Sequence, residues 1–206
     1  MTLEARWHAT WADLGLPSPG SGALEALLAR YREPARAYHT TRHLEECFAQ
    51  FDLARGLAAE PGEVQLALWF HDAVYDTRSA ENEERSAAWA DRVLAGVGAP
   101  DQVRRRVRGL ILATRHAAEP ETDDARLVVD IDLSILGAPP PRFGEYEAQV
   151  RREYGWVPEP VFRQARAKIL RAFLARPFVY ATGFFRNRLE ASARANLEAS
   201  LARLGA

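Results

Sequence analysis

The stretch PGEVQLALWFHD, residues 61–72, decides the fold because it is apolar on most of its helical surface. Val64, Leu68 and His71 recur at the spacing of one helical face, and the residues between them are largely apolar as well. A helix with this pattern must be surrounded by other helices, so we predict that it is central. The Pro-Gly dipeptide that opens the stretch marks its predicted start.

Helical spacing of apolar residues continues along almost the whole chain, and no stretch alternates like a half-buried strand. One such stripe contains Val161, Ala165, Ile169 and Phe173. Neither a repeat nor a flexible linker interrupts the pattern. We therefore predict an all-α fold with a single domain over residues 1–206. Its motif core would span about 35–136, followed by C-terminal helices at about 142–204.

The composition excludes several classes of protein. Lysine and arginine total 27 against 28 acidic residues, a balance that argues against a broad surface for duplex nucleic acid. Cys47 is the single cysteine, so no internal disulfide can form. No apolar run approaches the roughly 18 to 20 residues of a membrane span, and no charged and apolar leader opens the chain. A cytoplasmic protein without membrane contact is expected.

The dipeptide His71-Asp72 follows the most apolar segment of the chain. A buried ionisable pair is costly unless each group is neutralised, and a bound cation would neutralise it. Imidazole nitrogen and carboxylate oxygen together suit divalent Mn, Fe, Ni, Co, Zn or Mg rather than a thiolate-type zinc site. We therefore expect a divalent metal ion here.

A second candidate group is formed by His39 and His43, which are one helical turn apart. With Thr40 or Thr41 as N-cap, His43 would lie in the first turn of a helix whose apolar stripe includes Cys47. Taken alone, the pair is better explained as an ordinary surface or core feature than as a site.

The segment VVDIDLSILG supplies two further carboxylates. Asp132 shares a helical stripe with Val128 and Ile135, whereas Asp130 shares one with Leu127. Asp132 is therefore the predicted inward-facing candidate. The alternative is that Asp132 only caps a helix or pairs with an arginine.

This order of a His, a His-Asp pair and a distant Asp resembles the HD-domain superfamily of metal-dependent phosphohydrolases. The segments similar to bacterial predicted members are YHTTRHLEECF, WFHDAVYD, ENEERSA, ILATRH, DIDLSILG and RANLEASL, which cover roughly residues 35–200. The resemblance implies a helical bundle of the HD type with a metal bound by His43, His71, Asp72 and Asp132.

The segment from Tyr38 to His43 is also similar to the opening motif of cyclic-nucleotide phosphodiesterases. That similarity implies that His39 donates a proton and that His43 binds metal. The chain departs from the pattern after His71-Asp72, where Ala73 and Val74 stand instead of further histidines. The number of metal ions, one or two, is therefore left open.

Asp76, Glu83 and His116 are the candidates for a second metal or for substrate contact. Each has a structural alternative: Asp76 as a helix cap, Glu83 on a solvated face, and His116 as a cation at a helix C-terminus. Arg42, Arg85 and Lys168 are candidate phosphate contacts, although charged residues on helices are commonly only solvated.

Together these patterns predict hydrolysis of a phosphoester or phosphoanhydride, with Asp72 in the metal-bound catalytic centre and His39 as acid. The substrate would be a nucleotide or related small phosphate compound. One alternative is a metal-stabilised sensor or regulator that binds a nucleotide without turning it over. Another is an interaction bundle without metal. A homo-oligomer is left open.

Overall fold

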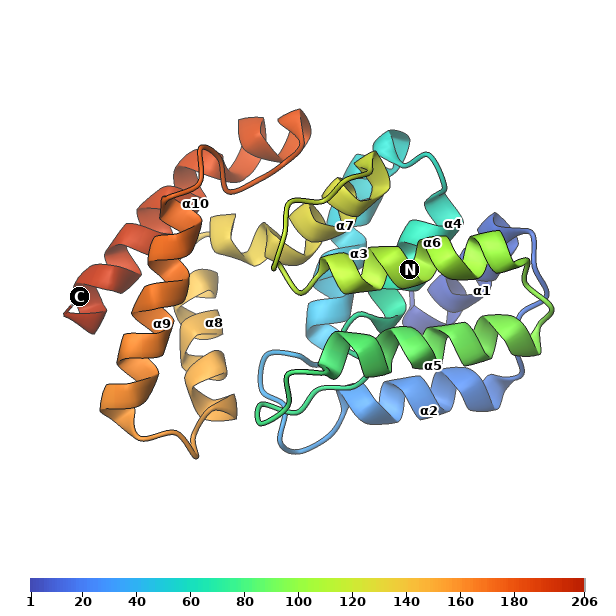
Figure 1. Cartoon of the computed structure of the whole chain (residues 1–206), viewed down its shortest axis with the longest axis horizontal. Helices are drawn as coiled ribbons and strands as arrows, with labels where there is room; N and C mark the ends of the chain where they lie inside the picture. The colour runs from blue at the N-terminus through green and yellow to red at the C-terminus, as the bar shows by residue number, and fades with distance from the viewer. Residues whose placement is uncertain (206) are drawn as a thin grey trace. The chain divides into compact units, whose positions relative to one another are not determined.

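The computed structural model describes residues 1–205, and within them it contains ten α-helices, two short 3-10 helices and no strand (Figure 1). The prediction of an all-α fold is confirmed. The chain divides into two units, Met1–Asp132 and Leu133–Ala206, whose boundary falls near the predicted end of the motif core. The single domain over residues 1–206 stays a prediction.

The first unit is organised around α4 (Pro61–Phe70). Around α4 lie α1 (Leu3–Leu14), α3 (Thr41–Ala54), α5 (Asn82–Gly96), α6 (Asp101–Ala113) and α7 (Asp123–Asp132), all of which contact it. The unit also contains α2 (Ser21–Tyr31) and the 3-10 helix η1 (Arg55–Leu57). Every residue of α4 after Pro61 is buried, as its sequence predicts. This helix is therefore the core of the unit.

The end of α4 is held by aromatic packing and by hydrogen bonds. The Trp69 ring packs edge-on against Trp7 at a centroid distance of 5.3 Å. Its indole Nε1 donates to Thr10 Oγ1 at 3.0 Å, and the Tyr31 hydroxyl donates to the Trp69 carbonyl at 3.0 Å. These two bonds satisfy the buried indole nitrogen and the buried carbonyl of Trp69. The residues that follow Trp69 leave α4 from a well-ordered position.

Gly62 allows α1 and α4 to approach each other closely. A Cβ atom at Gly62 would lie 2.6 Å from the backbone nitrogen of Leu14, which has no flexible end that could move away. By contrast, Gly109 on α6 has nothing within 4 Å of its hypothetical Cβ. The two helical glycines therefore form a matched pair for testing the packing.

We expect Gly62→Ala to lower the free energy of unfolding by ~1–3 kcal/mol because α1 must move away from α4. Gly109→Ala should raise it by up to ~1 kcal/mol because alanine is the better helix former. Chemical denaturation of both variants measures the difference. Equal effects would contradict the close α1–α4 contact.

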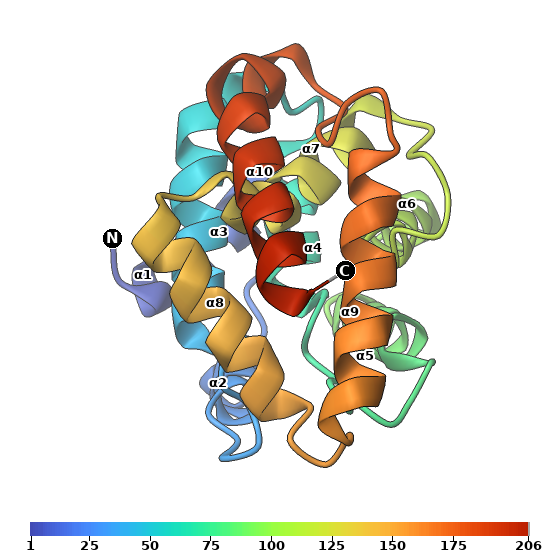
Figure 2. The same ribbon diagram turned by 90° about the vertical axis from the view of Figure 1, so that its left-hand side faces the viewer.

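The second unit contains η2 (Leu133–Gly137), α8 (Pro140–Glu153), α9 (Glu159–Leu174) and α10 (Gly183–Leu204), of which the three α-helices are labelled in Figure 2. Within this unit, Asn196 connects α10 with η2 and with Ala138, the residue that follows η2. Its Nδ2 donates to the carbonyls of Leu136 and Ala138, both at 2.8 Å.

The predicted stripe on α9 is only partly buried. Phe173 is buried, but Val161 and Ile169 are 55% and 48% exposed. Arg166 is buried instead, because its guanidinium donates to the Tyr146 hydroxyl at 2.9 Å and pairs with Glu147. Apolar periodicity misses this face because a paired arginine takes the place of an apolar residue.

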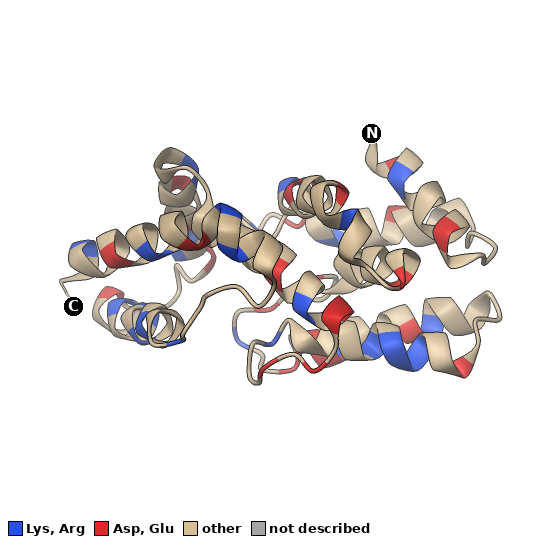
Figure 3. Ribbon diagram, turned by 90° about the horizontal axis from the view of Figure 1, so that it is seen from above, with Lys and Arg blue, Asp and Glu red and all other residues tan. Residues whose placement is uncertain are grey.

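Acidic and basic residues are interspersed along the helices (Figure 3). Opposite charges often meet across one helical turn, as in Arg42 and Glu46 on α3. In residues 1–205, no helix is both long enough and apolar enough to cross a membrane.

Candidate metal centre

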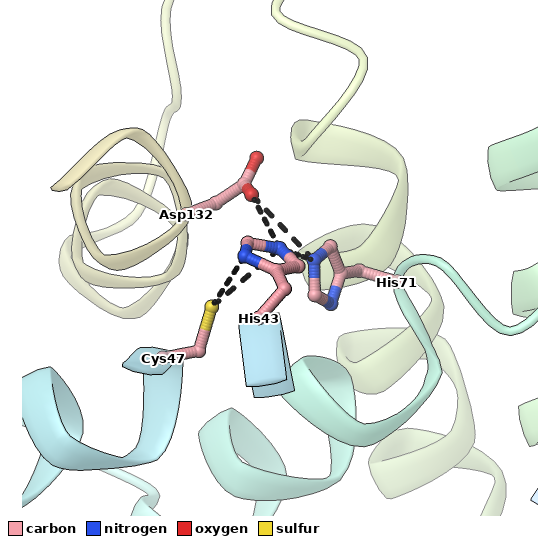
Figure 4. A group of neighbouring side chains, drawn as sticks. All are labelled: His43, Cys47, His71 and Asp132. Atoms are coloured by element: carbon pink, nitrogen blue, oxygen red, sulfur yellow. Dashed lines mark hydrogen bonds and ion pairs between the residues drawn. The ribbon is translucent and has the colours of Figure 1, made fainter. Parts of the chain in front are cut away.

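Segments distant in the sequence bring histidine and aspartate side chains together inside the first unit. His43 comes from α3, His71 and Asp72 directly follow α4, and Asp132 is the last residue of α7. Figure 4 shows His43, His71 and Asp132 pointing toward one another. The four metal ligands implied by the sequence thus lie in one cluster.

His43 is placed by the start of α3. Thr40 is the N-cap with an extended backbone, so His43 occupies the first turn, as its position after two threonines predicts. The His43 residue is only 1% exposed, and its ring packs against the Tyr38 ring at a centroid distance of 4.7 Å. The helix therefore presents this imidazole to the interior rather than to solvent.

His71 is oriented by the last turn of α4. Its backbone nitrogen donates to the Ala67 carbonyl at 2.9 Å, which continues the helical pattern by one residue. Its ring Nδ1 lies 2.8 Å from the Leu68 carbonyl, and because a carbonyl only accepts, Nδ1 carries a proton. In the neutral imidazole, Nε2 then offers its lone pair to the cluster, the arrangement typical of metal-binding histidines.

The distances between the polar atoms match those between ligands of one ion. The two Nε2 atoms are 3.0 Å apart. Asp72 Oδ2 lies 3.4 Å and 3.1 Å from Nε2 of His43 and His71, and Asp132 Oδ1 lies 3.3 Å and 3.5 Å from the same two atoms. With metal bonds of ~2.0–2.1 Å, adjacent ligand atoms are separated by about 3.0 Å in octahedral and about 3.4 Å in tetrahedral geometry. These four side chains could hold a metal ion.

Charge balance inside the cluster changes the protonation of all four groups. Burial raises the pKa of Asp72 and Asp132, but contacts with the neighbouring histidines outweigh it and hold both values well below 3.8. Burial lowers the pKa of His71, but the two carboxylates outweigh it and raise the value well above 6.5. Burial also lowers the pKa of His43, but Cys47 and Tyr38, followed by the two carboxylates, outweigh it and raise the value well above 6.5. The cluster therefore favours positive charge, either on its histidines or on a cation that they bind.

His116 holds the other oxygen of Asp132. Its Nε2 lies 3.0 Å from Asp132 Oδ2, while Oδ1 faces the two buried histidines. The backbone of His116 has φ of 55°, a left-handed conformation that is uncommon for residues other than glycine. This strained position after α6 directs the ring at Asp132. A role of His116 toward a second metal or substrate stays a prediction.

Asp130 is also buried, with no exposed surface. The interpretation that only one face of α7 is inward-facing is therefore wrong. Residues 127–131 are all buried because other elements cover α7 on several sides, and the helix gives way to the 3-10 turn η2 after Asp132. The stripe from Asp132 to Ile135 is thus not a continuous α-helical face. Asp132 nevertheless belongs to the cluster, as predicted.

Sequence reasoning missed Cys47 as a member of the cluster. Its Sγ lies 3.7 Å from both ring nitrogens of His43, and it joins His43, His71 and Asp132 in a set of ligand atoms within 4.8 Å of one another (Figure 4). The signal was the spacing of four residues between His43 and Cys47, which places two metal-binding side chains on one helical face. Its position in an apolar stripe made it resemble a core residue.

Arg36 is a second residue that sequence reasoning missed. Its guanidinium is buried and donates to the carbonyls of His39, Asp72 and Ala73 at 3.2, 2.6 and 3.2 Å. It thereby ties the turn before α3 to the segment after α4. No local pattern distinguishes this arginine from the exposed ones, since two of its three carbonyl partners, those of Asp72 and Ala73, are distant in the sequence.

His39 lies outside the ligand cluster but beside it. It occupies the turn before α3, and its ring stacks on Tyr75 at a centroid distance of 4.0 Å. The His39 and His43 ring centroids are 5.9 Å apart, and the charge of His39 contributes to the lowered pKa of Asp72. His43 therefore belongs to the cluster, whereas His39 lies beside it.

The remaining predicted site residues are exposed or half-buried. Asp76 is exposed, and its Oδ1 accepts from the backbone nitrogen of Arg78 at 2.9 Å, which is a turn interaction rather than the helix cap considered as its structural alternative. Glu83 is half-buried in the first turn of α5. The candidate phosphate contacts Arg42, Arg85 and Lys168 are all exposed, and Lys168 belongs to the second unit.

The chain was compared with protein-family models, curated proteins and solved structures. No family model, no curated protein and no solved structure matches the chain. The interpretation of the cluster therefore depends on the chemistry of its side chains.

We expect Asp132→Asn to weaken zinc binding by more than the ~10- to 100-fold typical of losing a residue that only orients a ligand. Asp130→Asn is the matched control, since it removes a buried carboxylate from the same helix outside the cluster. It should largely preserve metal binding. Titration calorimetry of both variants measures the difference, and stronger loss in the Asp130 variant would reverse the assignment.

Metal-free and metal-loaded protein should respond oppositely to pH. Raised imidazole pKa values stabilise the fold below pH 6.5, and this contribution is lost as pH rises through the folded-state values. Lowered carboxylate pKa values stabilise it above pH 3.8, and this contribution is lost only as pH falls through the folded-state values. Protein with chelator should therefore lose thermal stability as pH rises from 6.5.

Zinc-loaded protein should gain stability over the same pH interval, because ligand imidazoles must be neutral and metal binding releases protons. Melting curves at stepped pH, with chelator or with zinc, measure both slopes. Parallel slopes would show that zinc does not displace the protons of the cluster.

Proposed function

We propose that this protein is a metal-dependent phosphohydrolase of the HD type. It would cleave a phosphoester or phosphoanhydride in a nucleotide or related small phosphate compound. The observation that carries the proposal is the convergence of His43, His71, Asp72 and Asp132, whose ligand atoms lie 3.0–3.5 Å from their neighbours across the cluster. The order of these residues in the sequence and the all-helical fold support the same proposal.

A divalent ion, if bound by these residues, would supply a water of lowered pKa and would offset negative charge on phosphoryl oxygens. The carboxylates of Asp72 and Asp132 contribute to the raised pKa values of His43 and His71, so the cluster favours positive charge. A divalent cation would take the place of the protons that these rings otherwise hold. His71 is held by the Leu68 carbonyl, and Asp132 is held by His116. These contacts reduce the reorganisation that metal binding requires.

His39 is the proposed proton donor to the leaving oxygen. It lies next to the ligand cluster without belonging to it, and its ring is held against Tyr75. Arg36 fixes the backbone of His39 and of Asp72 through the same guanidinium, so the proton donor and a ligand keep a constant separation. General acid catalysis by such a positioned group typically contributes ~10²- to 10⁴-fold in rate.

A screen of nucleotides and simple phosphate esters with Mn, Mg, Ni, Co and Zn added in turn tests the proposal. Hydrolysis should stop with a chelator and return with a transition metal. Undiminished activity after exhaustive chelation, with metal absence confirmed, would exclude the mechanism. Nucleotide binding without any turnover would favour the sensor alternative instead.

Within this screen, His39→Ala should keep the metal and the folded stability but lower kcat for alkyl or ribosyl esters by ~10²- to 10⁴-fold. A nitrophenyl ester should be nearly indifferent, because its leaving oxygen needs little protonation. His8→Ala, at an exposed position on α1, is the control for removal of a histidine. Equal losses with both ester types, or loss of metal, would remove the acid role from His39.

A further inference from the structure

The thiol of Cys47 lies at the metal cluster rather than in a separate apolar environment. Cys47 is on α3 one turn after His43 and is 1% exposed. Its Sγ is 3.7 Å from His43 Nε2, the same atom that faces Asp72, Asp132 and His71. Because Cys47 follows His43 by one helical turn, its thiol lies beside the ring of a cluster member, 3.7 Å from both ring nitrogens.

The separations fit a sulfur ligand of the same ion. With metal–sulfur bonds of ~2.3 Å and metal–nitrogen bonds of ~2.0–2.1 Å, adjacent sulfur and nitrogen ligands are about 3.1 to 3.6 Å apart. The observed 3.7 Å is close to this range. The ligand atoms of His43, Cys47, His71 and Asp132 all lie within 4.8 Å of one another.

We propose that Cys47 binds, as a thiolate, the ion held by His43, His71 and Asp132. On binding, the S–H bond breaks, its proton leaves to solvent, and a sulfur lone pair forms the bond to the metal. No electron is transferred. The inference depends on the metal-binding part of the proposed function and not on hydrolysis.

A thiolate ligand determines which ions the site prefers. Soft sulfur favours zinc, cobalt and other borderline ions, whereas magnesium is a hard ion that takes oxygen ligands. The histidine and aspartate ligands alone would accept either kind of ion. Cys47 would therefore make the site selective for transition metals over magnesium.

Cobalt absorption spectroscopy tests this assignment directly. A thiolate bound to cobalt(II) produces a charge-transfer band in the near ultraviolet, which nitrogen and oxygen ligands do not produce. Cys47 is the single cysteine of the chain, so any such band must come from it. The wild-type protein loaded with cobalt should show the band, and Cys47→Ser should lose it while remaining folded by circular dichroism.

Glu45→Gln is the control, because Glu45 is an exposed acidic residue on the same helix, and this variant should keep the band. Cys47→Ser should also weaken zinc binding by more than ~10-fold while leaving magnesium binding unchanged, since serine removes the sulfur and little volume. If Cys47→Ser fails to fold, X-ray absorption of the zinc-loaded wild-type protein decides, with a sulfur neighbour expected at ~2.3 Å.

Cobalt-loaded wild-type protein without the band, or zinc with only nitrogen and oxygen neighbours, would overturn the proposal. In either case metal-dependent hydrolysis could still be measured, so the proposed function would stand. A band in a protein that hydrolyses none of the phosphate compounds would confirm the thiolate and count against the hydrolase. Protein that binds neither cobalt nor zinc would overturn the thiolate assignment, and protein that binds none of the ions in the screen would overturn the proposed function as well.

Discussion

Two buried imidazoles lie 3.0 Å apart and face two half-buried carboxylates across 3.1–3.5 Å. An uncompensated charge there would cost several kcal/mol, so each group depends on the others for neutralisation. This dependence explains why the aspartate pKa values fall while the histidine pKa values rise. It also makes the cluster a receptor for a cation, because one divalent ion can replace the protons on both rings.

The scaffold around the cluster restricts each of its members separately. Burial of α4 on all sides places His71, and the Leu68 carbonyl orients its ring. His116 restrains Asp132 from a left-handed backbone position, and Arg36 joins the segments that carry His39 and Asp72. Preorganisation of this kind is what a catalytic metal site needs, since ligands that must first be ordered weaken binding. The same restraints would serve a nucleotide sensor, which is why turnover has to be measured.

Much of the site could be predicted from local patterns. His71-Asp72 follows a strongly apolar run, so the ionisable side chains of these two residues had to be compensated. His43 lies in the first turn of the helix that Thr41 begins. Cys47 and Arg36 could not be assigned in this way. A cysteine in an apolar stripe looks like core, and an arginine looks solvated, until their distant partners are known. Asp130 shows the opposite error, because helical periodicity assumes one buried face and α7 has several.

The sequence by itself determined the helical class, the burial of α4 and the order in which metal-binding residue types occur, because these depend on spacing along the chain. Only the tertiary structure decided which side chains meet. His43 and His71 lie far apart in sequence, yet their Nε2 atoms are 3.0 Å apart, and Asp132 reaches both from a third helix. Their convergence depends on how α3, α4 and α7 pack around a shared core, and spacing within one helix carries no information about that packing.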